Sequence, residues 1–218
     1  MLVLASNSPR RYQLLSLGGW MFNIKPSEVD ESIANGETPA NYVIRLAKEK
    51  ALVCSKNGQS GQIIVAADTA VVDGKDILGK PENMVEATRM LKRLRNHTHQ
   101  VYTGIAALRI CDGQMSTDLC ITDVPMRNYS DEEIDAYVMT GDPLDKAGGY
   151  AIQHPKFRPV ESLGGCHASV MGLPLCHLTR TLRQLNMSTS ADIPGNCQSE
   201  LNYQCPIFRA VLRGENVG

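Results

Sequence analysis

The sequence predicts a mixed α/β fold. An apolar content of 43% and a charged content of 21% are those of an ordinary globular protein, and 218 residues are enough for one substantial core. The chain opens with an apolar strand, residues 2–5, followed by a helical segment. Two long stretches, 98–109 and 114–127, have the pattern of strands joined around Asp112-Gly113. Strands and helices alternating in this way predict a mixed α/β architecture.

The first strand is expected to end in a short polar loop and to be followed by a helix. Ser8 is suited to the N-cap of this helix and Pro9 to its first position. Arg10 and Arg11 come next, although that end of a helix carries a partial positive charge and favours acidic residues. An anion bound there would remove the conflict, since exposed backbone N–H groups and arginines both hold phosphate. An ordinary cap with solvated arginines is the alternative.

The second helix is expected at residues 39–56, after a strand at 21–25 and a polar loop at 26–38 that carries Glu31. At 3.6 residues per turn, Lys50 falls inside an apolar stripe. A lysine there either extends along the surface to water or meets a carboxylate or phosphate in a cleft. An apolar residue would suit the stripe, so replacing Lys50 by methionine is expected to leave stability unchanged or to raise it. The stripe consists of Val43, Leu46, Ala47, Val53 and Cys54.

Asp68 follows the apolar strand 62–67, and more strand is expected at 70–72. The carboxyl ends of strands are where open α/β sheets bind ligands. A carboxylate in that place suits a magnesium ligand or a general base. A turn aspartate that binds nearby backbone N–H groups is the alternative.

Two further helices are expected, one at 82–95 and one that begins after Ser130. A glycine-rich stretch follows at 141–165, and a final helix is expected at 174–185. Ser130 and Glu133 form a predicted capping box. From Asn186 onward no period persists. We therefore expect one domain at 1–185 and a loosely attached C-terminal extension of unknown role at 186–218.

Charge and cysteine usage exclude several classes of protein. A net charge of -1, from 22 basic and 23 acidic residues, predicts no general nucleic-acid or membrane surface. Neither a GxGxxG nor a GxxxxGK[ST] motif is present. Seven cysteines without a CxxC pair, a secretory leader or a long apolar span predict a cytoplasmic protein. The Cys166-His167 and Cys176-His177 pairs are poorly placed for zinc, and His97 and His99 are expected to be exposed.

Taken together, a series of short segments resembles the Maf family in order and spacing from residue 2 to about residue 185. The segments are ASNSPRR (5–11), VDES (29–32), AKEKA (47–51), ADT (67–69), GKP (79–81), PLDKAGGYAIQ (143–153) and VMGLPL (170–175). Outside this pattern, residues 154–163 do not align with the family, and Ser169 stands where the family often has asparagine.

The resemblance implies a mixed sheet in two lobes with a central cleft, as in the inosine triphosphate pyrophosphatases. It implies an enzyme that hydrolyses nucleoside triphosphates, dTTP and UTP preferred, to the monophosphate and pyrophosphate with a divalent metal, Mg²⁺ or Mn²⁺. A nucleotide-binding regulator of septum formation and an inosine triphosphatase-like specificity are the alternatives, and a homodimer is left open.

The resemblance also implies roles for individual residues of this chain. Asp68 and Glu31 would bind the metal, with Asp68 activating water. The further catalytic residues would be Lys50 and Lys80. The substrate would be bound by Ser6, Ser8, Arg10, Arg11, Thr69 and Gln153.

Overall fold

The computed structural model describes all 218 residues and is built on one mixed sheet of six strands. The strand order is β2-β1-β3-β5-β6, with β4 paired to the end of β3. Strands β1, β2 and β3 are parallel, and the remaining pairs are antiparallel. The strands are β1 (Leu2–Leu4), β2 (Phe22–Ile24), β3 (Ile63–Asp73), β4 (Asp76–Leu78), β5 (Thr98–Arg109) and β6 (Met115–Pro125). The predicted α/β class is confirmed.

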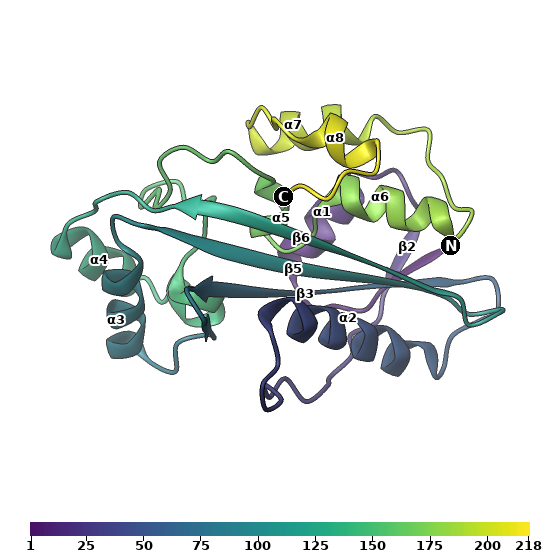
Figure 1. Ribbon diagram of the computed structural model, residues 1–218, viewed down its shortest axis with the longest axis horizontal. Helices are drawn as coiled ribbons and strands as arrows, with labels where there is room; N and C mark the ends of the chain where they lie inside the picture. Colours follow the sequence, from purple (N-terminus) through teal and green to yellow (C-terminus); the bar gives the residue numbers. More distant parts are fainter.

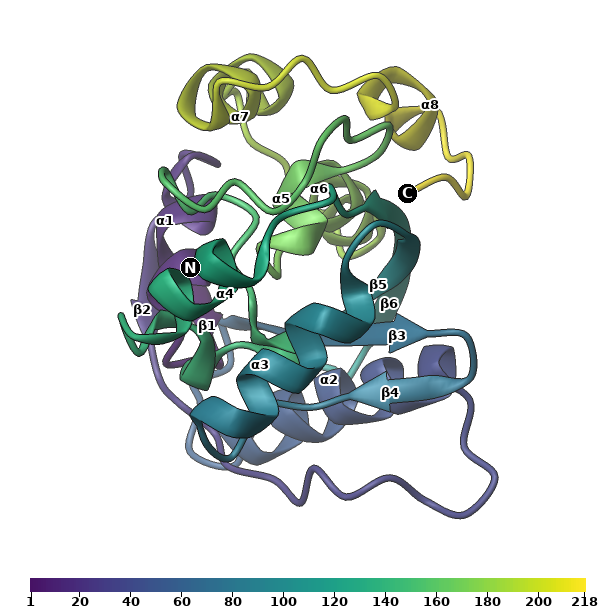
Figure 2. The same cartoon turned by 90° about the vertical axis from the view of Figure 1, so that its left-hand side faces the viewer.

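Helices cover both faces of this sheet (Figure 1). Helix α2 lies along one face, and α1, α5 and α6 lie on the other. Helices α3 and α4 gather at one end of the long strands, the end that faces the viewer in Figure 2. The helices are α1 (Pro9–Ser16), α2 (Pro39–Ser55), α3 (Met84–Leu94), α4 (Asp131–Val138), α5 (His167–Val170), α6 (Leu175–Gln184), α7 (Ile193–Leu201) and α8 (Phe208–Leu212), with short 3₁₀ turns η1 (Asp142–Asp145) and η2 (Ala147–Gly149).

The long strands β3, β5 and β6 run through two lobes, which gather at different positions along their length, as the resemblance predicts. One hydrophobic cluster packs β1 and the first half of β3 against α1 and α6. Another cluster joins the end of β3 to α3, α4 and the segment around Tyr150. Between the lobes lies a cleft of about 800 Å³.

Strand β3 runs through the predicted strand break at Asp68 without interruption. The expectation that this strand stops at Asp68 is wrong, because β5 pairs with β3 along almost its whole length and supplies hydrogen-bond partners past that point. The parallel partner β1 ends at Leu4, opposite Val65. Asp68 therefore lies beyond the carboxyl end of β1 but in the middle of β3.

Side chains of β3 alternate between the two faces of the sheet. Ile64 and Ala66 pack in the cluster under α2, whereas Val65 and Ala67 pack in the cluster under α6. Asp68 is paired with Gly104 on β5. A side chain at Gly104 would not fit, because its Cβ would lie only 2.6 Å from the carbonyl oxygen of Val43 in α2. This close approach of helix and sheet places α2 directly above Asp68.

Two further predictions, those for Val53 and His99, are corrected by the structure. Val53 of the predicted stripe is 37% exposed although the next residue, Cys54, is buried, so Val53 lies at the edge of the buried face of α2. His99 is buried, since its ring packs edge-on to Tyr150 and contacts the Tyr150 hydroxyl at 2.8 Å. None of the helices combines the length and apolar character needed to cross a bilayer.

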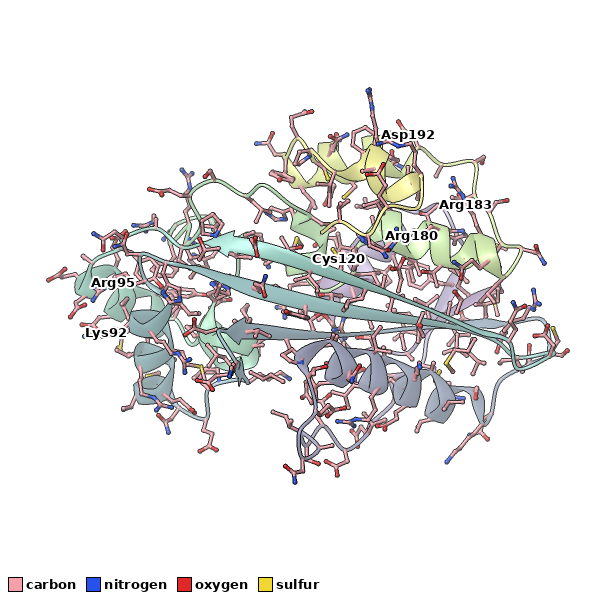
Figure 3. All side chains as sticks on the ribbon, viewed as in Figure 1. Lys92, Arg95, Cys120, Arg180, Arg183 and Asp192 are labelled. Carbon is pink, nitrogen blue, oxygen red and sulfur yellow. The ribbon has the colours of Figure 1, made fainter.

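The segment 186–218 is more regular than expected, because it forms α7 and α8. These helices lie over α6 in Figure 1, and Val217 accepts a hydrogen bond from His177 of α6. Figure 3 shows Arg180 of α6 near the sheet, where it forms an ion pair with Asp118 of β6. The extension thus carries helices that contact the rest of the chain, and the domain boundary at residue 185 stays a prediction.

Candidate active site

The cleft between the lobes collects every residue that the sequence nominated. Its lining comes from the loop after β1, the polar loop before α2, the middle of β3, the turn after β4 and the segment after η2. The nominated residues that line it are Ser6, Ser8, Arg10, Arg11, Glu31, Lys50, Asp68, Thr69, Lys80 and Gln153. Lys80 and Gln153 are exposed at its rim, whereas Lys50 and Asp68 are buried at its base.

Lys50 joins the two carboxylates of the site. Its Nζ donates to Oδ1 of Asp68 and to Oε1 of Glu31, both at 2.6 Å. The lysine is 8% exposed, so of the two alternatives for Lys50 the structure shows the one in which it meets carboxylates. The turn-aspartate alternative for Asp68 does not apply, because its carboxylate contacts a side chain from the middle of a continuous strand.

The two carboxylates differ in how readily they hold a proton. Burial raises the pKa of Asp68 above its ordinary value, although the nearby Lys50 and Arg11 oppose this. Burial also acts against ionisation of Glu31, but the hydrogen bond and charge of Lys50 outweigh it and lower the pKa of Glu31. A pair of carboxylates with pKa values pushed in opposite directions is typical of acid–base sites, and Asp68 is the better proton acceptor of the two.

The start of α1 is built as predicted, with Ser8 as N-cap accepting from the backbone N–H of Arg11. The two arginines have partners that the sequence did not reveal. Arg11 Nε donates to the carbonyl of Gly172 at 2.9 Å, and its Nη2 donates to the Thr69 hydroxyl at 3.3 Å. Nη1 of Arg10 lies 4.0 Å from Oδ2 of Asp145, which belongs to the opposite lobe. Arg11 is thus held in place, whereas Arg10 has only a loose partner.

Gly172 must be glycine for this arrangement. Its φ of +108° lies in the region that side chains disfavour, and an added Cβ would approach Arg11 Nε to 3.2 Å. The glycine of the VMGLPL segment therefore lets the backbone come close enough to hold the arginine.

The loop that carries Glu31 is anchored to α2. The Tyr42 hydroxyl donates to the Glu31 carbonyl at 2.9 Å, and Arg45 donates to the Ser32 carbonyl at 2.9 Å. Arg45 also forms a two-pronged pair with Glu37, at 2.7 and 2.8 Å. Sequence reasoning missed these residues, and the available signal was that Tyr42 and Arg45 are three positions apart on one side of α2.

Weakening the Glu37–Arg45 pair is expected to have a pH-dependent effect on stability. The hydrogen bond from Arg45 lowers the pKa of Glu37 to about 2, below the ordinary glutamate value of about 4.3. The pair therefore stabilises the fold fully above the ordinary value and loses this contribution as the pH falls towards 2. We expect Glu37→Gln to melt at a lower temperature than the parent protein at pH 7, and the difference to shrink below pH 4.

Thermal melts from pH 7 to pH 2 test this expectation. Glu161→Gln is the matched control, because Glu161 is exposed. A deficit for Glu37→Gln that is the same at pH 7 and pH 2.5 would contradict the role of the charge.

Sequence reasoning also missed Lys146 at the opposite wall of the cleft. Its Nζ donates to the carbonyl and Oδ1 of Asp142, at 2.7 and 3.0 Å, and to Asp145 Oδ1 at 2.5 Å. Lys146 is buried, and Asp145 also faces Arg10. This lysine anchors the carboxylate that the loose arginine meets.

Comparison with known proteins gives one consistent result. The family model described as "Maf-like protein" matches residues 1–185. A dTTP/UTP pyrophosphatase of Geotalea uraniireducens is 43% identical over 185 residues, which cover 84% of this chain and 94% of that protein. A dTTP/UTP pyrophosphatase of Dehalococcoides mccartyi is 38% identical over 215 residues, 99% of this chain and 94% of that protein. Residues after 185 therefore have a counterpart in that relative.

Among solved structures, a dITP/XTP pyrophosphatase from Mycobacterium abscessus aligns with a TM-score of 0.41 and 13% identity, over 85% of this chain and 94% of that chain.

Proposed function

The chain belongs to the Maf family, and from this premise we propose that its cleft hydrolyses nucleoside triphosphates, dTTP and UTP preferred, to the monophosphate and pyrophosphate. The observation that carries the proposal is the buried cluster of Asp68, Lys50 and Glu31 beside the N-terminus of α1. The carboxylates that would bind a metal and accept a proton from water thus lie in the same cleft as the cationic side chains that would bind phosphate.

The triphosphate lies at the start of α1 in this proposal. The N-terminus of that helix and the side chains of Ser8, Arg10 and Arg11 supply N–H, O–H and guanidinium donors. The Arg10–Asp145 separation of 4.0 Å leaves Arg10 available to exchange a carboxylate for a phosphate. Lys80 adds a cation from the opposite rim.

The residues present suit a divalent cation, Mg²⁺ or Mn²⁺. Lys50 contacts Oδ1 of Asp68 and Oε1 of Glu31, so the second oxygen of each carboxylate remains for a metal. One or two carboxylates completed by phosphate oxygens and water are how proteins commonly hold Mg²⁺. A cation bound there supplies positive charge against the charge that develops on the phosphoryl oxygens.

Asp68 is the group that takes the proton from the attacking water. Burial raises its pKa, which strengthens it as a base, and Lys50 fixes the direction of the carboxylate. The positive charge of Lys50 also attracts the phosphates, whether or not a metal is bound.

Arg11, Thr69 and Gln153 form the side that meets the base. Nη2 of Arg11 donates to the Thr69 hydroxyl at 3.3 Å, and Gln153 lines the same cleft. A uracil or thymine edge carries two acceptors around one N–H donor, which arginine, a hydroxyl and an amide together match.

We place the reaction in the cytoplasm, because all seven cysteines are free thiols.

Product analysis tests the reaction. With Mg²⁺ or Mn²⁺ we expect dTTP and UTP to yield pyrophosphate and the monophosphate, with ATP and GTP turned over poorly. Release of orthophosphate as the first product would overturn the assignment. Equal kcat/KM for 7-methyl-GTP and dTTP would overturn the base preference alone.

A further inference from the structure

A chain of hydroxyl hydrogen bonds runs from the cleft into the core. Thr69 of β3 is paired with Thr103 of β5, and their Oγ1 atoms lie 3.0 Å apart. Thr103 is fully buried and does not line the cleft. Its hydroxyl donates to the carbonyl of Ser169 at 2.9 Å. That carbonyl also accepts from the backbone N–H of Gly172 at 2.8 Å.

The direction of each hydrogen bond in this chain is fixed by elementary chemistry. A hydroxyl has one proton, and a carbonyl can only accept. The proton of Thr103 is therefore used on Ser169, so Thr69 must donate its own proton to Thr103. Arg11, a pure donor, uses one lone pair of Thr69 at 3.3 Å. Towards the cleft, Thr69 has only its remaining lone pair to offer.

We propose that Thr103 is a positioning residue that makes the Thr69 hydroxyl an acceptor towards the cleft, so that the site selects uracil and thymine against cytosine. The inference rests on the proposed function. The ring nitrogen between the two exocyclic groups carries a proton in uracil and thymine, and that N–H suits an acceptor. In cytosine the same nitrogen is an acceptor and meets the lone pair of Thr69 without a proton between them.

Replacing Thr103 by valine tests the inference without changing the cleft lining. The side chain keeps its shape but accepts nothing, so Thr69 regains a proton that can turn towards the base. For the parent protein we expect kcat/KM to be about 10- to 100-fold higher for UTP than for CTP, the effect of one mismatched buried hydrogen bond. In Thr103→Val the ratio is expected to fall to about threefold, mainly through a lower KM for CTP. Thr103→Ser restores the hydroxyl and the ratio.

Two further variants separate positioning from packing. Thr122→Val is the matched control, because Thr122 is also fully buried but lies on β6 outside the cleft lining. It is expected to keep the parent ratio. In a Thr69→Val background, adding Thr103→Val is expected to change the ratio no further, since the effect passes through Thr69.

The outcomes are distinguishable from failure of the proposed function. A folded Thr103→Val protein with the parent UTP/CTP ratio overturns the role of Thr103. A parent protein that hydrolyses CTP as well as UTP overturns it whether or not the variant folds. If the parent protein releases no pyrophosphate from UTP or dTTP, the proposed function fails instead.

Discussion

Replacing Asp68 by asparagine is expected to lower kcat for UTP by about 10³-fold while the protein remains folded. Asparagine has nearly the same shape, but it cannot take a proton from water and is a weaker metal ligand. Asp68 is 7% exposed, and its carboxylate contacts Lys50 at the base of the cleft. The loss should fall on kcat rather than KM, because the arginines proposed to hold the triphosphate are unchanged.

Steady-state release of pyrophosphate measures this effect, and circular dichroism checks the fold. Asp73→Asn is the matched control, because Asp73 ends the same strand and pairs with Arg93 outside the cleft lining. That variant should keep its rate. An Asp68→Asn protein with more than about a tenth of the parent kcat would show that another group accepts the proton.

Replacing Lys50 by methionine is expected to destabilise the protein by about 3 kcal/mol and to weaken triphosphate binding. The sequence suggested no loss of stability, because methionine suits the apolar stripe of α2. The structure changes that expectation, since Lys50 lies between Asp68 and Glu31 at 2.6 Å from each. Removing one partner of a buried ion pair leaves the other charge uncompensated, which typically costs about 3–5 kcal/mol.

Denaturant unfolding at pH 7 measures the free energy. The double variant Lys50→Met/Asp68→Asn should recover most of the loss, because it removes the stranded carboxylate. Lys48→Met is the control, since Lys48 is exposed on the same helix. A Lys50→Met protein as stable as the parent would mean that Asp68 does not depend on Lys50 for its charge.

Local rules predicted much of the fold and the position of the site. The cap at Ser8 and the capping box at Ser130 are confirmed, because such motifs involve only neighbouring residues. The inward direction of Lys50 followed from helical period alone. Arg10 and Arg11 were singled out together by their conflict with the helix start, and both line the cleft.

What the sequence could not predict depends on contacts between distant segments. The length of β3 is set by β5, which pairs with it beyond Asp68. The partner of Arg10 is Asp145, which is 135 positions away along the chain and comes close only when the lobes assemble. Thr103 gave no signal, since a threonine in a strand is ordinary and its importance arises from the hydroxyl across the sheet.

The alternation of β3 has a consequence for how such a cleft can change over generations. Asp68 faces α2, whereas Thr69 is held by Arg11 and Thr103 on the other side of the sheet. In the proposed mechanism, bond cleavage and choice of base therefore fall on opposite sides of one strand. If these roles hold, a substitution at Thr103 can alter which base is accepted without a direct contact to the lysine–carboxylate cluster, whereas a change at Arg11 would affect both sides, because its charge also acts on Asp68.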